Sequence, residues 1–230
     1  MSMTRFTPSV ESKPIREIAY ETLKHAIITG QIPAGARIVE TEYADKLHIS
    51  RTPLREALRK LERDGLVEYV LRRGVMVRAF TLADVEEIYT IRNALEMLTI
   101  PAIINNATPE DIRSLREKLH KMDAYISKND IEGVSPLARS FHDELTAISG
   151  LNRILRVIQG QDEYIRRFSA MSIAKETRRK VAHEEHYKLL EYLEKRDLSN
   201  FEKLMRKHIE RSKETCLSAL AEANYLKNRD

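Results

Sequence analysis

Hydrophobic residues recur every three or four positions along most of the chain, a spacing typical of amphipathic helices. Near the N-terminus this pattern predicts a helix over residues 15–29, which Gly30 would end, and a short second helix over residues 39–47. The pattern does not extend to residues 1–10, which we expect to form a flexible tail.

A third helix is expected to begin at the sequence Ser-Arg-Thr-Pro and to end at Gly65. Thr52 suits the N-cap because its hydroxyl can accept a hydrogen bond from an unpaired backbone N–H. Pro53 suits the first helical position, where no N–H is needed. One face of this helix is apolar, and another carries three arginines spaced by four residues: Arg51, Arg55 and Arg59. The pattern therefore predicts a helix that packs on one side and presents guanidinium groups on the other.

The next two apolar runs, residues 66–70 and 75–78, are short and rich in valine, which is typical of β-strands. Between them lies the sequence Leu-Arg-Arg-Gly, so we expect a β-hairpin with Arg72, Arg73 and Gly74 at its tip. Two helices, a short turn, a basic helix and a basic hairpin together indicate a winged helix-turn-helix domain, over residues 11–79.

From residue 82 onward the helical spacing continues with no competing strand pattern. Thr81 with Asp84, and Thr108 followed by Pro109, are typical helix starts, whereas Pro101 is expected to kink or interrupt the first helix. The predicted helices cover residues 82–105, 109–127, 135–148, 152–171, 175–195 and 198–225. The predicted fold class is therefore mainly α, with an N-terminal winged helix-turn-helix that carries a small β-hairpin wing and a C-terminal all-α helical bundle, an effector-binding and dimerisation domain over residues 80–226.

Length and composition agree with two helical domains. A chain of 230 residues is long enough for both. No apolar stretch approaches the roughly 18 residues that span a bilayer, and the N-terminus lacks the apolar core of a signal peptide, so we expect a cytoplasmic protein with no membrane partner. Cys216 is the single cysteine, which excludes intrachain disulfides and thiolate metal clusters.

Charge is distributed unevenly along the chain. Residues 51–78 hold eight Lys and Arg against four Asp and Glu, whereas residues 79–230 are balanced. This predicts a polyanion partner for the N-terminal domain alone, and the helix-turn-helix pattern indicates that the partner is double-stranded operator DNA. Arginine can grip guanine through two hydrogen bonds and hydroxyls can hold phosphates, so Arg51, Thr52 and Arg55 are candidate DNA contacts together with the hairpin tip.

Three segments resemble the GntR family of bacterial regulators: residues 50–58 (SRTPLREAL), 61–67 (LERDGLV) and 73–77 (RGVMV). The resemblance implies operator contacts at the matching positions Arg51, Thr52, Arg55, Arg73 and Gly74. It departs at Thr41, where a relative carries a DNA-contacting arginine, so that base contact does not carry over to this chain.

Residues 82–225 resemble the all-helical FCD ligand domain of the FadR branch of that family. The resemblance rests on Tyr89-x-x-Arg92-x-x-x-Glu96, on Phe141-His142, on Ser149-Gly150 and on the stretches that begin at His186 and Met205. It implies a small carboxylate effector. The candidate effector contacts are Arg92, Arg166 or the adjacent Arg167, which can grip a carboxylate with two hydrogen bonds, and Asn152.

In many FCD domains three histidines and one aspartate hold a divalent metal, and the resemblance places the histidines at His142, His186 and His208. Imidazole is a good ligand for zinc or nickel. The aspartate should lie one helical turn before His142, but that position is Ala138. His183, one turn before His186, is a candidate support for it.

Two alternatives follow from Ala138. Either the three histidines hold a metal whose remaining positions go to water or effector, or the metal is absent. Asp143 and Glu144 directly follow His142 in sequence, so they point away from the imidazole face and do not replace the missing aspartate.

We interpret the chain as a homodimeric repressor that binds a palindromic operator and responds to a carboxylate in its helical domain. Two other functions stay open: a metal-dependent enzyme that uses the three histidines, and an effector-independent DNA-binding protein. The sequence contains no His-Glu-x-x-His pattern or comparable arrangement of nucleophile and base, which disfavours the enzyme.

Overall fold

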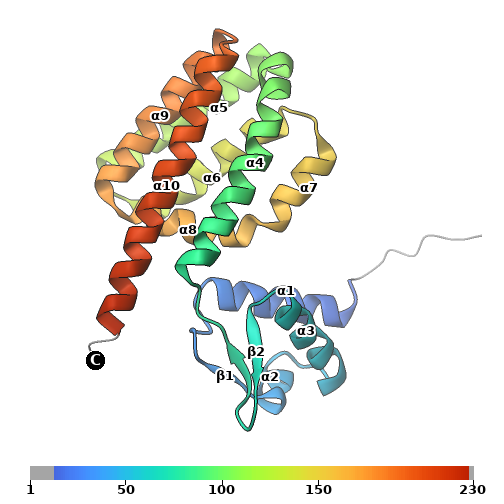
Figure 1. Ribbon diagram of the computed structural model, residues 1–230. Coiled ribbons are helices and arrows are strands. Elements are labelled where there is room, and N and C mark those ends of the chain that lie inside the picture. Colours follow the sequence, from blue (N-terminus) through green and yellow to red (C-terminus); the bar gives the residue numbers. More distant parts are fainter. Residues whose placement is uncertain (1–12, 228–230) are drawn as a thin grey trace, which may run out of the picture. The chain divides into compact units, whose positions relative to one another are not determined.

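The computed structural model describes residues 13–227, apart from the side chains of residues 162, 163, 166, 167, 170 and 223–227. The tail expected over residues 1–10 lies outside the described residues. The chain forms two compact units that divide between Phe80 and Thr81 (Figure 1). Each unit has its own buried apolar core.

Within residues 13–80, the N-terminal unit combines helices with a small antiparallel sheet (Figure 1). Its elements are α1 (Ile15–Ile28), β1 (Arg37–Ile38), α2 (Glu40–Lys46), α3 (Arg51–Arg63), β2 (Val67–Val70) and β3 (Gly74–Val77). Helix α3 packs against α1, and its apolar residues Leu54, Leu58 and Leu61 are fully buried. This arrangement is a winged helix-turn-helix, with β2 and β3 as the wing.

The sheet contains a strand that the sequence pattern did not reveal. Its order is β1-β3-β2, with Ile38 opposite Val75 and Val67 opposite Val77. Strand β1 has two residues only, which is too short for a detectable alternation of apolar and polar positions.

The start of α3 differs from the prediction. The N-cap is Ser50, so Thr52 is not the cap, and Pro53 is the third helical residue rather than the first. Proline is accommodated there because the N–H groups of the first turn have no partner inside the helix. The Ser50 side chain makes no capping hydrogen bond.

The C-terminal unit, over the described residues from 81 onward, is a bundle of helices (Figure 1). They are α4 (Leu82–Asn106), α5 (Pro109–Ser127), α6 (Ile131–Ala147), α7 (Asn152–Gly160), α8 (Asp162–Ala174), α9 (Glu176–Glu194) and α10 (Leu198–Lys227). Helix α10 packs along α4, α8 and α9, and α5 packs against α6 and α9. Among the described residues, no helix combines the length and the apolar character needed to cross a membrane. The predicted fold class is confirmed.

Of the two predicted effects of Pro101, a kink or an interruption, the interruption does not occur, because α4 continues through the proline. The proline itself is exposed, whereas its neighbours Ile100 and Ile103 are buried. Both halves of the helix are therefore anchored in the same core, which outweighs the loss of one backbone hydrogen bond.

Two other boundaries differ from the prediction. Helix α6 begins at Ile131 instead of residue 135, because the Asp130 side chain caps it by accepting a hydrogen bond from the Gly133 N–H. The helix expected over residues 152–171 is two helices, α7 and α8, which meet at Gln161 directly after Gly160. Glycine has low helix propensity, so the chain changes direction there at little cost.

The starts of α4 and α5 agree with the prediction. Thr81 and Thr108 each accept a hydrogen bond from the backbone N–H three residues later. In return, Asp84 and Asp111 accept one from the backbone N–H of the cap residue. These two capping boxes fix where the long helices of the bundle begin.

Candidate functional sites

The N-terminus of α3 is an exposed, positively charged site. Arg51 and Thr52 are its first two helical residues, and both are exposed. Within the described part of the chain, neither side chain has a hydrogen bond or an ion pair. The unpaired N–H groups of the first helical turn add partial positive charge, which favours phosphate.

Arg55, one turn later on α3, is held by a neighbouring helix. Its Nε lies 2.7 Å from Oε2 of Glu40, the first residue of α2. Arg55 is exposed, and the ion pair fixes the direction of its side chain. Thr41 follows Glu40 on α2 and is also exposed.

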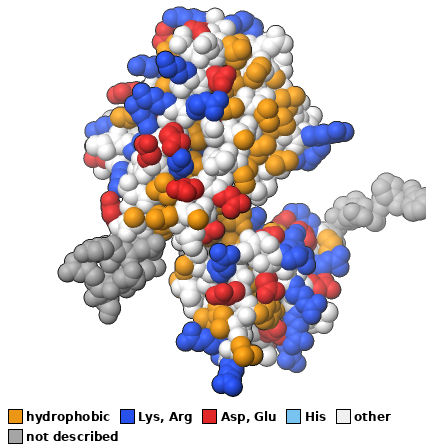
Figure 2. All heavy atoms as spheres, viewed as in Figure 1, with side chains coloured by type: hydrophobic (Ala, Val, Ile, Leu, Met, Phe, Trp, Pro, Cys, Tyr) orange, Lys and Arg blue, Asp and Glu red, His pale blue; other side chains and the backbone are white. Residues whose placement is uncertain are grey.

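The tip of the β2–β3 hairpin carries the second basic group. Arg72 and Arg73 are exposed, and Arg72 has a left-handed backbone, with φ 65°. Gly74 also has a positive φ, of 82°, which glycine adopts without strain. A Cβ at Gly74 would lie within 4 Å of the Arg37 side chain, so Arg37 of β1 adds a cation beside the wing. Figure 2 shows basic side chains on the N-terminal unit, including its lower edge, where Figure 1 places the hairpin tip.

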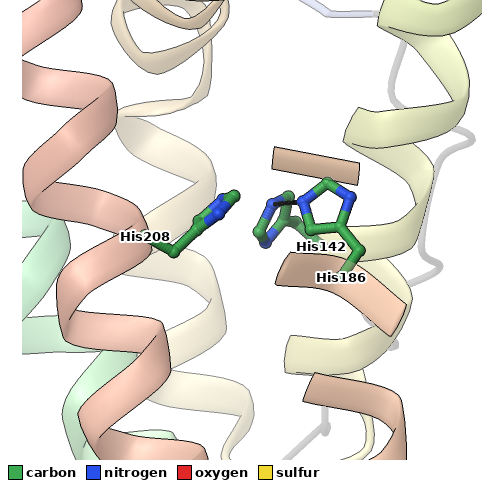
Figure 3. Close-up of side chains that lie close together, drawn as sticks. All are labelled: His142, His186 and His208. Carbon is green, nitrogen blue, oxygen red and sulfur yellow. Dashed lines mark hydrogen bonds between the residues drawn. The ribbon is translucent and has the colours of Figure 1, made fainter. Parts of the chain in front are cut away.

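Three histidines from three helices of the C-terminal unit form one cluster. His142 lies on α6, His186 on α9 and His208 on α10, and their rings point toward one another (Figure 3). One ring nitrogen from each lies within 4.8 Å of the others. The Nε2 atoms of His142 and His186 are 3.1 Å apart.

Burial favours the neutral form of these imidazoles. Burial, together with the neighbouring histidines, lowers the pKa of His142 and of His186 well below the ordinary value. Burial also lowers the pKa of His208, although the hydrogen bond to Glu185 opposes that change. Neutral imidazoles are the form that binds metal.

A carboxylate orients the third histidine. Nδ1 of His208 lies 2.8 Å from Oε2 of Glu185, so its Nδ1–H donates to the carboxylate and Nε2 is left as the ligand atom. Glu185 also accepts hydrogen bonds from Arg178 and Arg211. Burial alone would raise the pKa of Glu185, but its hydrogen bonds to His208 and Arg211 and the charge of Arg178 lower it to about 2.

The donor set fits a divalent metal. A tetrahedral zinc ion with nitrogen ligands at about 2.0–2.1 Å needs ligand atoms ~3.4 Å apart. The Nε2 atoms of His142 and His186 are near this separation, at 3.1 Å, and the His208 nitrogen lies within 4.8 Å of them. Nδ1 of His186 is buried without a hydrogen-bond partner among the described residues, and the hydrogen bond that this ring makes is the one between its Nε2 and His142 inside the cluster.

An alanine, Ala138, occupies the position at which the metal-binding aspartate was expected. Ala138 is buried and lines the cavity beside the cluster, and its methyl group supplies no ligand. Asp143 pairs with Arg139 and Glu144 with Lys118, so neither acidic neighbour of His142 takes the place of the aspartate. A metal held by the three histidines would retain at least one position for water or an effector.

The cluster forms part of the wall of a cavity, which with its opening to solvent has a volume of about 920 Å³. Part of the wall is apolar, formed by residues of α5, α6 and α8 such as Met122, Val134 and Ile173. Arg92 of α4 also lines the cavity, and its Nε lies 2.6 Å from Oε1 of Glu96.

Comparisons with known proteins bear on both units. The family model described as "Bacterial regulatory proteins, gntR family" matches residues 15–77, and the FCD domain model matches residues 87–211. The chain belongs to the GntR family. The HTH-type transcriptional regulator YdhC of Bacillus subtilis is 31% identical over 180 residues, which cover 77% of this chain and 80% of YdhC.

A second relative in the GntR family matches along nearly the full length. The HTH-type transcriptional repressor RspR of Escherichia coli is 25% identical over 213 residues, 93% of each chain. The solved structure of E. coli McbR/YncC superposes with a TM-score of 0.69 at 21% identity, covering 90% of this chain and 99% of that one, and shows a shared fold.

The predicted effector contacts of this GntR-family protein do not all converge. Arg92 lines the cavity with the three histidines. Asn152 is exposed at the start of α7 and is not among the residues that line the cavity. The side chains of Arg166 and Arg167, on α8, lie outside what the structure describes.

His183 is buried and also lines the cavity, but it does not support His186. Its Nε2 lies 2.6 Å from Oδ1 of Asp123 on α5.

Sequence reasoning missed Glu185, Arg178 and Arg179, which contact or neighbour the site in this GntR-family chain. Glu185 is adjacent in sequence to His186 yet binds His208, which lies on another helix. A spacing pattern carries no signal for such a contact. Arg178 and Arg179 are buried arginines in a polar stretch that sequence alone indicates to be exposed.

Proposed function

We propose that this GntR-family protein is a transcriptional repressor that leaves its operator when a small carboxylate binds in the FCD domain. The observation that carries the proposal is the histidine cluster in the wall of a cavity, in a chain whose other unit presents exposed arginines at a helix start and a wing. RspR, which matches along 93% of this chain, is named a repressor. Because the relatives are transcription regulators, we propose that this protein regulates transcription in the cytoplasm and is not an enzyme.

His142, His186 and His208 would hold a divalent metal, zinc or nickel. When bound, the metal supplies a positive centre to which a carboxylate oxygen can bind. Glu185 orients His208 for this task, and Ala138 leaves a ligand position that the effector carboxylate would take. The effector would thus replace the aspartate that this chain lacks.

Arg92 would hold the same end of the effector. It is buried on the cavity wall, where Glu96 accepts from its Nε. A carboxylate would therefore bind through its Nη groups, of which Nη1 lies 3.5 Å from Oγ of Ser169.

Arg51, Thr52 and Arg55 would contact the major groove, while Arg72, Arg73 and Gly74 would contact DNA through the wing. Symmetric operators require a homodimer. Leu98 of α4 and Val157 of α7 are apolar side chains that are 61% and 52% exposed. Figure 2 shows hydrophobic side chains gathered on the face of the C-terminal unit where Figure 1 places these two helices. We assign this face to the dimer contact.

The test measures DNA affinity with and without metal and acid. A DNA duplex selected by the protein from a random-sequence pool would be titrated by fluorescence anisotropy with zinc-loaded full-length chain. A carboxylate that acts as effector should weaken binding about 5- to 150-fold, the usual size of coupling between two sites.

The variant His186→Ala should bind the duplex with unchanged affinity and lose the response to acid. His120→Ala is the matched control, because His120 is exposed and outside the cluster, and it should respond as the wild type does. An acid response that persists in His186→Ala would contradict the proposed site.

A further inference from the structure

Arg179 of α9 is a buried cation on the wall of the same cavity. Its side chain is 2% exposed and lines the cavity. Nη1 donates to the backbone oxygen of Ile173, 2.7 Å away, and Nη2 donates to Oδ1 of Asn129. Both acceptors are uncharged, and Nε is buried without a hydrogen-bond partner among the described residues.

Arg179 differs in this respect from the other arginines that line the cavity. Each of the three others has a carboxylate within 4 Å: Arg92 with Glu96, Arg139 with Asp143 and Arg178 with Glu185. Within the described part of the chain, Arg179 has none. The carbonyl of Ile173 lies near the end of α8 and offers only the partial negative charge of a helix C-terminus. Glu176, three residues earlier on α9, interacts electrostatically with Arg179, but it is exposed and forms its ion pair with Lys180. A buried full charge with no carboxylate in contact is unfavourable, so an anion from outside the chain would stabilise this side chain.

The spacing between Arg179 and the histidines limits the shape of a ligand that could bind to both. Arg179 precedes His186 by seven residues on α9, which is two helical turns or about 10.5 Å along the axis. The two side chains therefore start about two turns apart along one helix, so a ligand that binds at both ends must be extended rather than compact.

Small and apolar side chains occupy the cavity wall along this path. Ala138 lies one turn before His142 on α6, and Ala182 lies one turn before His186 on α9. Ile126 and Val134, close in sequence to the Asn129 that binds Arg179, add apolar surface. His183, between Arg179 and His186 on α9, also lines the cavity, so a ligand body between the two ends would contact these methyl groups as well as the His183 ring.

We propose that the effector is two-headed: one carboxylate binds at the histidine cluster, a second binds Arg179, and an apolar segment joins them. This rests on the effector site proposed above and narrows its ligand from carboxylates in general to extended dicarboxylates.

The test compares adipate with hexanoate, which has the same chain length and a single carboxylate, by calorimetric titration of the zinc-loaded full-length protein. A charged hydrogen bond at Arg179 should make adipate bind at least about tenfold tighter than hexanoate. Succinate, which is too short to reach both ends, should not gain this advantage.

The advantage of adipate should disappear in Arg179→Gln and be partly retained in Arg179→Lys, which keeps the charge. The matched control is Arg139→Gln, because Arg139 lines the same cavity but has its own carboxylate, and it should retain the advantage. Helical circular dichroism and hexanoate affinity report whether each variant is folded with an intact cavity.

Three outcomes would overturn the proposal. Equal binding of adipate and hexanoate by the wild type would show that the site binds a single carboxylate. The proposed function as a carboxylate sensor would still stand. An equal loss of both ligands in Arg179→Gln, or an adipate advantage that survives there, would show that Arg179 only supports the helices. Binding of neither acid to zinc-loaded protein would overturn the effector function itself, and the two-headed ligand with it.

Discussion

Arg51 combines exposure with a position at the positive end of α3. No described residue engages its side chain, and Ser50 leaves the first helical turn without a side-chain cap. The residue can therefore donate to DNA without breaking an internal interaction. Arg55 differs, because DNA would have to share it with Glu40.

The substitution Arg51→Ala should weaken binding to the selected operator by about 1–3 kcal/mol and relax the sequence preference, as expected for loss of a base contact. Competition titrations against duplexes with single base changes would measure both effects. Arg63→Ala at the other end of α3 removes the same charge and should change affinity little. Equal effects of the two substitutions would mean that Arg51 contributes only general charge.

Glu185 acts on the site through His208. The substitution Glu185→Gln should lower zinc affinity about 10- to 100-fold, because loss of a carboxylate that orients a histidine ligand has an effect of this size. A competition titration with a chromophoric chelator measures the affinity. Glu184→Gln is the matched control, since Glu184 is exposed on the same helix. Unchanged zinc affinity in Glu185→Gln would show that the Glu185 carboxylate only stabilises the fold through its ion pairs and does not orient His208 for metal binding.

At the scale of elements, the capping boxes of α4 and α5 define where the bundle helices start. Thr108→Ala removes the hydroxyl that accepts from the Asp111 N–H, and it should lower the free energy of unfolding by about 0.5–2 kcal/mol. Chemical denaturation of the full chain measures this change. In Thr90→Ala, the hydroxyl that is lost bonds only to the Glu86 carbonyl of its own helix, so stability should change much less. An equal decrease in the free energy of unfolding in both variants would show that the capping hydrogen bond does not account for the stability change.

These caps also show which elements a sequence can predict. Thr81 and Thr108 act within four residues, so the pattern alone located both helix starts. The Asp130 cap was missed because Gly133 and Pro136 follow it and resemble helix breakers. Strand β1 was missed because its two residues form a strand only by pairing with β3, which is distant in sequence.

The sequence predicted the three histidines of the candidate site but not the residues that contact them. A family resemblance located His142, His186 and His208, whose sequence separations alone carry no signal. The partners of these histidines could not be predicted, because Glu185 and Arg178 reach His208 across the gap between two helices. Burial of Arg179 is likewise set by tertiary packing and not by the polar stretch in which it occurs.

At the scale of the whole molecule, the proposed regulation has two copies of the chain bind one operator. Leu98→Arg places a charge on the exposed apolar face assigned to the dimer, and burying that charge should weaken the dimer at least about tenfold. Sedimentation velocity over a range of concentrations measures the dissociation constant, and operator affinity should fall in parallel. Leu198→Arg, at an exposed leucine that begins α10, is the control. A dimer that persists in Leu98→Arg would assign the contact to another face.

The central claim is that a carboxylate binds this chain through a metal held by His142, His186 and His208, and thermal unfolding tests it most directly. Protein stripped of metal would be melted alone, with zinc or nickel, with a panel of mono- and dicarboxylates, and with both. At a hundred times its dissociation constant, a ligand stabilises by about 2.7 kcal/mol, a shift of several degrees for a chain of this size. We expect an acid to raise the melting temperature only when metal is present, and we expect His186→Ala to abolish this shift while His120→Ala retains it. An acid that stabilises the metal-free protein or His186→Ala to the same extent would contradict the central claim.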